Sequence, residues 1–150
     1  MHVRSDRRHR FAVEPDELWA AVTAVDRYPD WWPWLRSFEA TALVVGDAWR
    51  CVVQPPLPYS VRFTLTIDEV VPAQRVAATV RGDITGTASV ELTARPEGGT
   101  EARLVADLAP THLLLRAMGV LAGPVVRRAH DWVLDTGARQ FRDRALRAGS

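Results

Sequence analysis

Hydrophobic and polar residues alternate through the middle of the chain, in segments separated by short runs that contain Gly, Pro or Asp. Alternation with a period of two is typical of strands that bury one face. The short separators predict hairpin connections and therefore an antiparallel sheet. The predicted strands are residues 7–13, 37–45, 48–54, 59–70, 75–82, 84–94 and 101–109.

Helical periodicity flanks this alternating region on both sides. An acidic start at residues 14–17, with Pro15 in it, predicts a short helix over 18–25, and a second short helix begins at residue 26. After the last strand we expect a short helix over 111–122 and one long helix over 124–147. The order predicts an α+β fold, in which a seven-stranded antiparallel sheet is covered by the long C-terminal helix.

The strand alternation assigns an inner face that carries almost no titratable group and many small side chains. Small residues on the concave face of a curved sheet predict a cavity. The simpler alternative is that large side chains of the helix fill that space. The inward set includes Tyr59, Val61, Phe63, Leu65, Ile67, Val76, Ala78, Val80, Ile84, Gly86, Ala88, Val90, Leu92, Ala102, Leu104, Ala106 and Leu108.

The apolar stripe of the long helix contains a histidine and a glycine. His130 lies on this stripe, and Gly137 follows two turns later, where a helix interior normally disfavours glycine. A glycine at position 137 either leaves space in the cavity, because it has no side chain, or allows the helix to approach the sheet closely. His130 is either a buried neutral imidazole with a hydrogen-bond partner or a polar group in an apolar pocket. The stripe consists of Val126, His130, Val133, Leu134, Gly137 and Phe141.

Charge and composition narrow the classes of function. Nineteen basic against 18 acidic residues give a net charge of +1, which is not the footprint of a nucleic-acid-binding protein. All the basic residues other than histidine are Arg, so lysine chemistry is excluded. The single cysteine, Cys51, excludes an internal disulfide and any multi-cysteine metal site. We expect neither a metal nor a cofactor.

Length and hydropathy indicate one domain over residues 1–150, of which 47% are hydrophobic. No apolar run approaches the roughly 20 residues of a membrane span, and no apolar segment of a secretory signal follows the basic start. We therefore expect a cytoplasmic protein. Its oligomeric state, monomer or homodimer, is open.

Three stretches together resemble the polyketide cyclase and lipid-transport branch of the START-like (Bet v 1-like, SRPBCC) superfamily. The first is a strand, a Pro-acidic helix with a Trp, and a Tyr-Pro-x-Trp-Trp element. The resemblance covers nearly the whole chain, in the right order. The residues that carry it are Pro15, Glu17, Trp19, Tyr28, Pro29, Trp31 and Trp32, then 82–86 with 97–100, then 122–126 with 130–133 and Gly137.

The resemblance implies a helix-grip fold, in which the sheet curls around the C-terminal helix and encloses an elongated apolar cavity. Its members bind lipids, polyketides and other apolar molecules, and some catalyse aromatic polyketide cyclisation or dehydration. We expect a hydrophobic small-molecule ligand. The candidate ligand-binding residues are Trp31, Trp34, Tyr59, Val61, Phe63, Leu65, Val80, Gly86, Ala88, Val90, Leu104, Ala106, His130, Val133, Leu134, Gly137 and Phe141.

Two other functions stay open. One is a polyketide cyclase or dehydratase that uses His130 as acid and base. Few other titratable groups have the inward phase: His9 and Glu69 are candidates, and two tyrosines could donate hydroxyls. This set is small for an enzyme, so binding is favoured over catalysis. The other is a protein-interaction module that uses an exposed Trp31–Trp34 patch.

Overall fold

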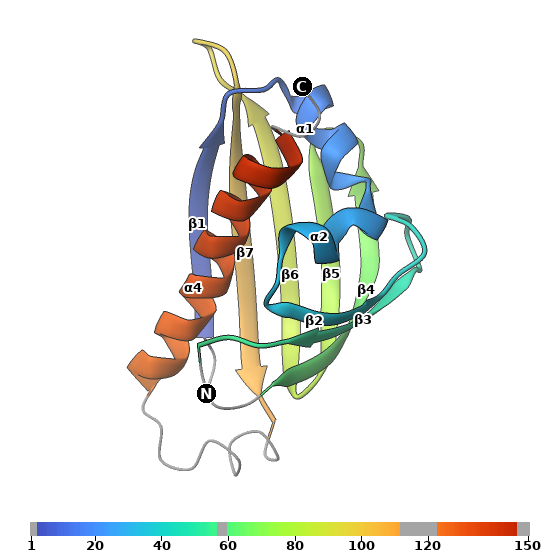
Figure 1. Ribbon diagram of the computed structural model, residues 1–150, viewed down its shortest axis with the longest axis vertical. Helices are drawn as coiled ribbons and strands as arrows, with labels where there is room; N and C mark the ends of the chain where they lie inside the picture. The colour runs from blue at the N-terminus through green and yellow to red at the C-terminus, as the bar shows by residue number, and fades with distance from the viewer. Residues whose placement is uncertain (1–2, 57–59, 112–122, 147–150) are drawn as a thin grey trace.

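The computed structural model of the protein describes residues 3–56, 60–111 and 123–146. A seven-stranded sheet forms its centre, in the order β1-β7-β6-β5-β4-β3-β2 (Figure 1). All neighbouring strands are antiparallel, which confirms the predicted meander. The strands are β1 (Val3–Phe11), β2 (Leu35–Glu39), β3 (Ala48–Val53), β4 (Val61–Val71), β5 (Arg75–Gly82), β6 (Ile84–Ala94) and β7 (Thr100–Pro110).

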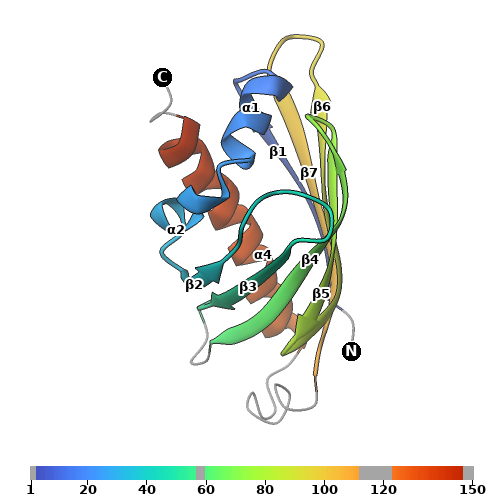
Figure 2. The same cartoon turned by 90° about the vertical axis from the view of Figure 1, so that its right-hand side faces the viewer.

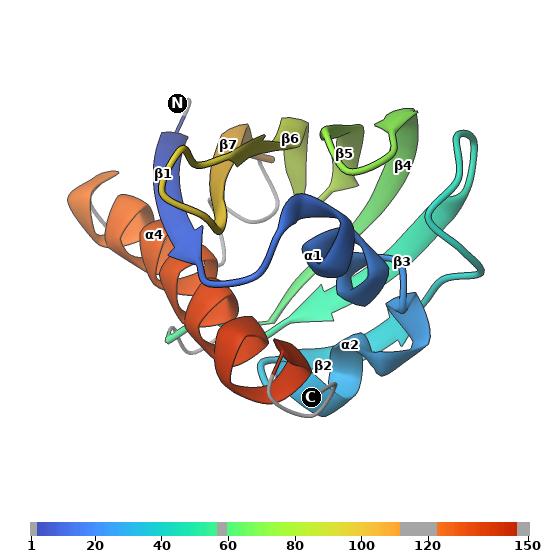
Figure 3. The same cartoon turned by 90° about the horizontal axis from the view of Figure 1, so that it is seen from above.

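The helices lie on the concave side of the sheet. Helices α1 (Pro15–Val22) and α2 (Tyr28–Trp31), with a 3₁₀ turn at Val25–Arg27 between them, connect β1 to β2. The long helix α4 (Gly123–Gln140) continues as a π-helical segment, Phe141–Leu146. The sheet curls around α4, and α1 and α2 lie at the other side of the opening (Figures 2 and 3). This is the α+β helix-grip arrangement predicted from the sequence. The helix predicted over 111–122 lies outside the described residues.

Strand β1 begins at Val3, four residues before the predicted start at residue 7. Charged side chains of β1 form ion pairs with charged side chains of β7. Asp6 forms a bidentate ion pair with Arg103 of β7, and Arg8 contacts Glu101 at 3.1 Å. Cross-strand pairs of opposite charge stabilise neighbouring strands, so the polar face of β1 is compatible with a strand.

Strand β2 is shorter than the predicted 37–45 and ends at Glu39. The carboxylate of Asp47 accepts hydrogen bonds from the backbone N–H groups of Thr41 and Ala42, which therefore do not pair with a strand. These N–H donors hold the pKa of Asp47 below its usual value. Asp47 thus converts the second half of the predicted strand into a loop, with Val44 and Val45 exposed at its tip.

Strand β4 contains a bulge that changes its alternation. The register with β5 shifts between Ile67, which lies opposite Ala78, and Glu69, which lies opposite Ala77. A bulge moves the following side chains to the other face of the sheet. Glu69 is therefore exposed and contacts Arg75 at 3.2 Å. The expectation that Glu69 faces inward is wrong, because strand phase was extended through the bulge.

Candidate functional site

A pocket of about 390 Å³ lies between the concave face of the sheet and the helices. Ligand pockets commonly measure about 300–1,000 Å³, so this one is sufficient for a small organic molecule. Side chains from β1, both short helices, the strands and α4 all contribute to its wall, and nearly all of them are aliphatic or aromatic. The pocket can therefore make many apolar contacts with a ligand but provides few hydrogen-bonding groups.

Alanines form part of the sheet side of the pocket. Ala78, Ala88, Ala102 and Ala106 line it, as expected for small residues on the concave face. Gly86 differs from them. It has a φ of +148°, and a Cβ there would clash with the carbonyl oxygen of Asp107 on β7. Gly86 is thus required for the approach of β7 to β6, and its lack of a side chain does not enlarge the pocket.

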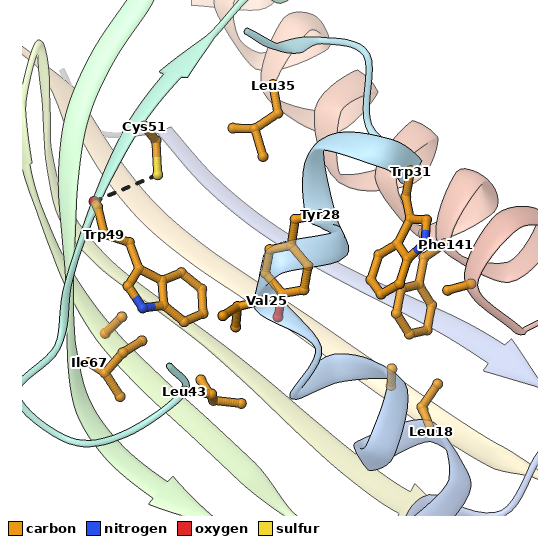
Figure 4. Close-up of a cluster of buried hydrophobic side chains, with 14 of the residues drawn as sticks. Leu18, Val25, Tyr28, Trp31, Leu35, Leu43, Trp49, Cys51, Ile67 and Phe141 are labelled. Carbon is orange, nitrogen blue, oxygen red and sulfur yellow. Dashed lines mark hydrogen bonds between the residues drawn. The ribbon is translucent and has the colours of Figure 1, made fainter. Parts of the chain in front are cut away.

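An aromatic cluster closes one side of the pocket. Tyr28 of α2 lies between Trp31 and Trp49, with ring centroids 5.6 and 5.7 Å away (Figure 4). Trp31 is 5% exposed and packs edge-on against Phe141 of the C-terminal segment. Aromatic pairs at these distances stabilise a core beyond the area that they bury. Trp31 is therefore a core residue of the contact between α2 and the C-terminal segment.

The two other tryptophans of this segment bind α4 through their indole nitrogens. Trp32 Nε1 donates to the carbonyl oxygen of Gly137 at 2.9 Å, and Trp34 Nε1 donates to Oε1 of Gln140 at 2.8 Å. A Cβ on Gly137 would lie 3.2 Å from Cζ2 of Trp34. Gly137 therefore permits close approach, as one of the two sequence interpretations held, but the approaching groups are indole rings and not the sheet.

The structure places most of the predicted site residues on the pocket wall. Trp31, Val61, Val80, Gly86 and His130 are not among the lining residues, and Tyr59 lies outside the described residues. The predicted residues that line the pocket are Trp34, Phe63, Leu65, Ala88, Val90, Leu104, Ala106, Val133, Leu134, Gly137 and Phe141.

Several lining residues were absent from the predicted site. They come mainly from the short helices and from β2 and β3, whose place over the concave face no local pattern reveals. The shared phase of Trp49, Cys51 and Val53 was the available signal for β3. The additional lining residues include His9, Phe11, Leu18, Trp19, Val22, Tyr28, Trp32, Leu35, Phe38, Leu43, Trp49, Cys51, Val53 and Ile67.

His130 lies in the seam, the interface where α4 packs against β1, and is not among the residues that line the pocket. Its Nδ1 is 3.2 Å from Oγ of Ser5, a β1 residue that is 3% exposed. The Ser5 hydroxyl donates to Oδ1 of Asp131 at 2.5 Å, so Asp131 meets the same serine. Burial lowers the pKa of His130, Asp131 opposes this shift, and Arg127 adds to it. This geometry fits the buried, hydrogen-bonded interpretation of His130.

His9 lies on the same seam and does line the pocket. Its side chain is 16% exposed, and Nε2 is 3.2 Å from Oδ1 of Asp135, outside hydrogen-bonding angles. Asp135 also receives two hydrogen bonds from the guanidinium of Arg7, at 3.0 and 2.7 Å. Burial lowers the pKa of His9 and Asp135 opposes the shift, while Arg142 and Arg7 add to it.

Of two other titratable groups on the wall, one is engaged in a hydrogen bond within the protein and the other is unreactive. The hydroxyl of Tyr28 donates to the carbonyl oxygen of Val22, and burial raises the pKa of this tyrosine. Cys51 is buried, and burial raises the pKa of its thiol to about 12. A thiol with so high a pKa is not a nucleophile at neutral pH, so Cys51 acts as a small buried side chain of the wall.

A curled antiparallel sheet that packs around a long C-terminal helix and an apolar pocket defines the class of helix-grip proteins. The sequence matches one family of this class. The sequence model of that family, "Polyketide cyclase / dehydrase and lipid transport", matches residues 11–136. The chain therefore belongs to the polyketide cyclase/dehydrase and lipid-transport family. No curated protein matches the sequence.

Solved structures with similar folds include three that cover almost the whole chain. A START superfamily protein from Mycobacterium smegmatis has a TM-score of 0.77 at 13% identity, with 99% of each chain covered. The protein TTHA0849 from Thermus thermophilus has a TM-score of 0.76 at 14% identity, with 100% of each covered. The Zhui aromatase/cyclase from Streptomyces sp. R1128 has a TM-score of 0.72 at 16% identity, covering 97% of this chain and 92% of that one. At these identities the likeness shows the fold alone.

Proposed function

We propose that this protein binds an apolar or aromatic small molecule in the pocket between the sheet and α4. The observation that carries the proposal is a pocket of about 390 Å³ whose wall consists almost wholly of aliphatic and aromatic side chains. Each Å² of apolar ligand surface that leaves water contributes about 25 cal/mol. Within the described part of the chain, no helix is long and apolar enough to cross a membrane. A cytoplasmic location stays a prediction from the sequence.

The geometry supports binding more than the two alternatives. A cyclase that used His130 as acid and base would need this imidazole at the pocket, whereas its Nδ1 contacts Ser5 in the seam. An interaction surface around residues 31–34 would need exposed rings. Trp31 is buried, and the indoles of Trp32 and Trp34 are bound to α4. Neither alternative gains support from the placement of its key residues.

Uptake of an apolar fluorescent probe, N-phenyl-1-naphthylamine, tests the proposal together with a variant that fills the pocket. Ala88→Phe adds a ring at a lining position of β6. We expect the native protein to bind the probe, with a rise in its fluorescence, and Ala88→Phe to lose most of this signal.

Thr87→Phe is the matched control, because Thr87 is the exposed neighbour of Ala88 on the opposite face of the same strand. It adds the same ring and keeps the pocket, so probe binding is expected to be unchanged. Circular dichroism establishes that both variants are folded. Failure of the native protein to take up the probe, or equal uptake by folded Ala88→Phe, would show that the pocket does not bind apolar molecules.

A further inference from the structure

His9 brings an imidazole to the wall of an otherwise apolar pocket, and no hydrogen bond is made by either ring nitrogen within the described residues. Its Nε2 is the one buried side-chain nitrogen or oxygen without a hydrogen-bond partner among residues 3–56, 60–111 and 123–146. Buried polar groups in native proteins nearly always have partners, so an exception at a pocket wall requires an explanation. The same-face neighbours of His9 on β1 are Phe11, which has no polar group, and Arg7, whose guanidinium donates to Asp135. Ala102, opposite on β7, supplies no side-chain hydrogen bond.

Asp135 fixes which edge of the imidazole is available. Its Oδ1 faces Nε2 at 3.2 Å, and its two hydrogen bonds from Arg7 keep the carboxylate in place. A carboxylate at this edge favours the neutral tautomer that carries its proton on Nε2. Nδ1 then presents a lone pair, and it has no hydrogen-bond partner in the described part of the chain. Because His9 lines the pocket, an acceptor without a protein partner on its ring suits a ligand that donates a hydrogen bond.

We infer that His9 is the polar anchor of the pocket, and that its Nδ1 accepts a hydrogen bond from a hydroxyl group of the ligand. The preferred ligands are hydroxylated aromatic molecules, such as phenols and naphthols, over equally large molecules without a hydroxyl. The inference rests on the proposed function, because the anchor acts only on a molecule in the pocket. Asp135 is a positioning residue that acts through His9.

The remaining polar groups on the wall leave His9 as the group for this role. The hydroxyl of Tyr28 is bound to a backbone carbonyl, and the thiol of Cys51 is a weak hydrogen-bonding group. Arg75 is paired with two glutamates, and Ser89 has the outward phase of β6. A ligand hydroxyl that entered the pocket without an acceptor would lose its hydrogen bonds to water, so the acceptor determines which molecules bind well.

The anchor also predicts how binding depends on pH. The charged groups that act on His9 are Asp135 and Arg142 from the C-terminal helix and Arg7 from its own strand. Protonated His9 has a hydrogen on Nδ1 and no longer accepts one. Because burial lowers its pKa, the neutral form persists somewhat below the usual value of about 6.5. Affinity for a naphthol is therefore expected to be constant near neutrality and to fall as the pH falls through this lowered pKa.

Competition against N-phenyl-1-naphthylamine compares two ligands that differ in the donor hydrogen, 2-naphthol and 2-methoxynaphthalene. The native protein is expected to bind 2-naphthol about three- to tenfold more tightly, which is the size of one net hydrogen bond. In His9→Leu this preference disappears, because no acceptor remains at that place on the pocket wall. His9→Asn keeps an acceptor oxygen near the place of Nδ1 and is expected to retain part of the preference.

His130→Leu is the matched control, because it removes the other seam histidine without touching the pocket wall. Its preference for 2-naphthol should equal that of the native protein. Equal binding of both ligands to the native protein, or a preference that survives in His9→Leu, overturns the anchor while leaving the pocket intact. Failure of the native protein to bind the fluorescent probe and both naphthalenes overturns the proposed function itself, and the two failures are thereby distinguished.

Discussion

The seam between β1 and α4 holds two histidines in contrasting environments. His130 makes a polar contact with Ser5, whose hydroxyl also binds Asp131, and so belongs to a closed hydrogen-bonded group. His9 lies farther along β1, beside Phe11, where the seam opens into the pocket. Its ring has a carboxylate at one edge and no hydrogen bond to it. Two residues of one type on one interface therefore have different hydrogen-bonding surroundings.

The difference shows that the face on which a histidine lies does not alone determine whether its ring is hydrogen-bonded; the residues opposite it decide this as well. Both histidines occupy inward positions of their elements, as periodicity indicates. Ser5 is small and polar, so the seam can close around His130 and satisfy it. Phe11 and Ala102 give His9 no such partner, and the nearest carboxylate is shared with Arg7. The pocket end of the seam is therefore the end with free hydrogen-bonding capacity.

The largest expected effect is a loss of stability when the ring of Phe141, which packs beside the pocket, is removed. Phe141→Ala deletes a ring that is 6% exposed and contacts Phe11 and Trp31. Loss of a buried phenylalanine ring lowers the free energy of unfolding by about 3–5 kcal/mol. Urea denaturation measures this change. Trp132→Ala on the outer face of α4 is the comparison; its ring is 37% exposed, so a smaller change than at Phe141 is expected. Equal effects of the two substitutions would contradict the role given to Phe141.

The closed end of the seam is tested by Ser5→Ala. This change removes the hydroxyl shared by His130 and Asp131 and leaves both without that partner. We expect the free energy of unfolding to fall by about 1–3 kcal/mol, with probe binding by the folded protein unchanged. Ser37→Ala, at an exposed position of β2, is the control for removal of a serine hydroxyl. Loss of probe binding in folded Ser5→Ala would place this group in the site instead of the seam.

The tryptophan contacts to α4 are tested by a double-mutant cycle. Trp34→Phe and Gln140→Leu each remove one partner of the 2.8 Å hydrogen bond between Nε1 and Oε1. The coupling free energy is expected to be about 0.5–1.5 kcal/mol, the net value of one hydrogen bond. Denaturation of the four proteins gives this coupling directly. Strictly additive effects would show that this hydrogen bond does not couple the tryptophan segment to α4.

The smallest expected effect is a pH dependence of stability. Burial lowers the pKa of His130 in the folded protein, so between that pKa and the usual value of about 6.5 the unfolded chain binds more protons. The stabilising contribution of the neutral imidazole is therefore complete above about pH 7 and is lost as the pH falls through this interval. His130→Leu is expected to lose less stability than the native protein between about pH 7.5 and 5.5. An equal loss in both proteins would contradict the buried environment of His130.

The fold was accessible from the sequence because it depends on patterns that extend over many residues. Period-two alternation, turn residues and the helical stripe predicted the seven strands and the C-terminal helix. Local features were not accessible in this way. The capping of the 41–42 amides by Asp47 shortened β2, and the bulge after Ile67 moved Glu69 to the outer face.

The candidate site was predicted in part for a similar reason. Residues on the sheet and on α4 followed from phase, and most of them line the pocket. The contribution of the short helices depends on how they lie across the sheet, which no local pattern specifies. His130 was favoured over His9 because its stripe was clearer, and the partner that satisfies it, Ser5, is 125 residues away in sequence.

Nitrogen-15 NMR of the histidine side chains tests the contrast between the two imidazoles most directly. Histidine-labelled protein is titrated with 2-naphthol and with 2-methoxynaphthalene, and His9→Asn and His130→Leu assign the resonances. Our account predicts that 2-naphthol shifts the Nδ1 resonance of His9 much more than 2-methoxynaphthalene does, while the resonances of His130 stay in place. A shift of His130 Nδ1 without a shift of His9 would contradict it.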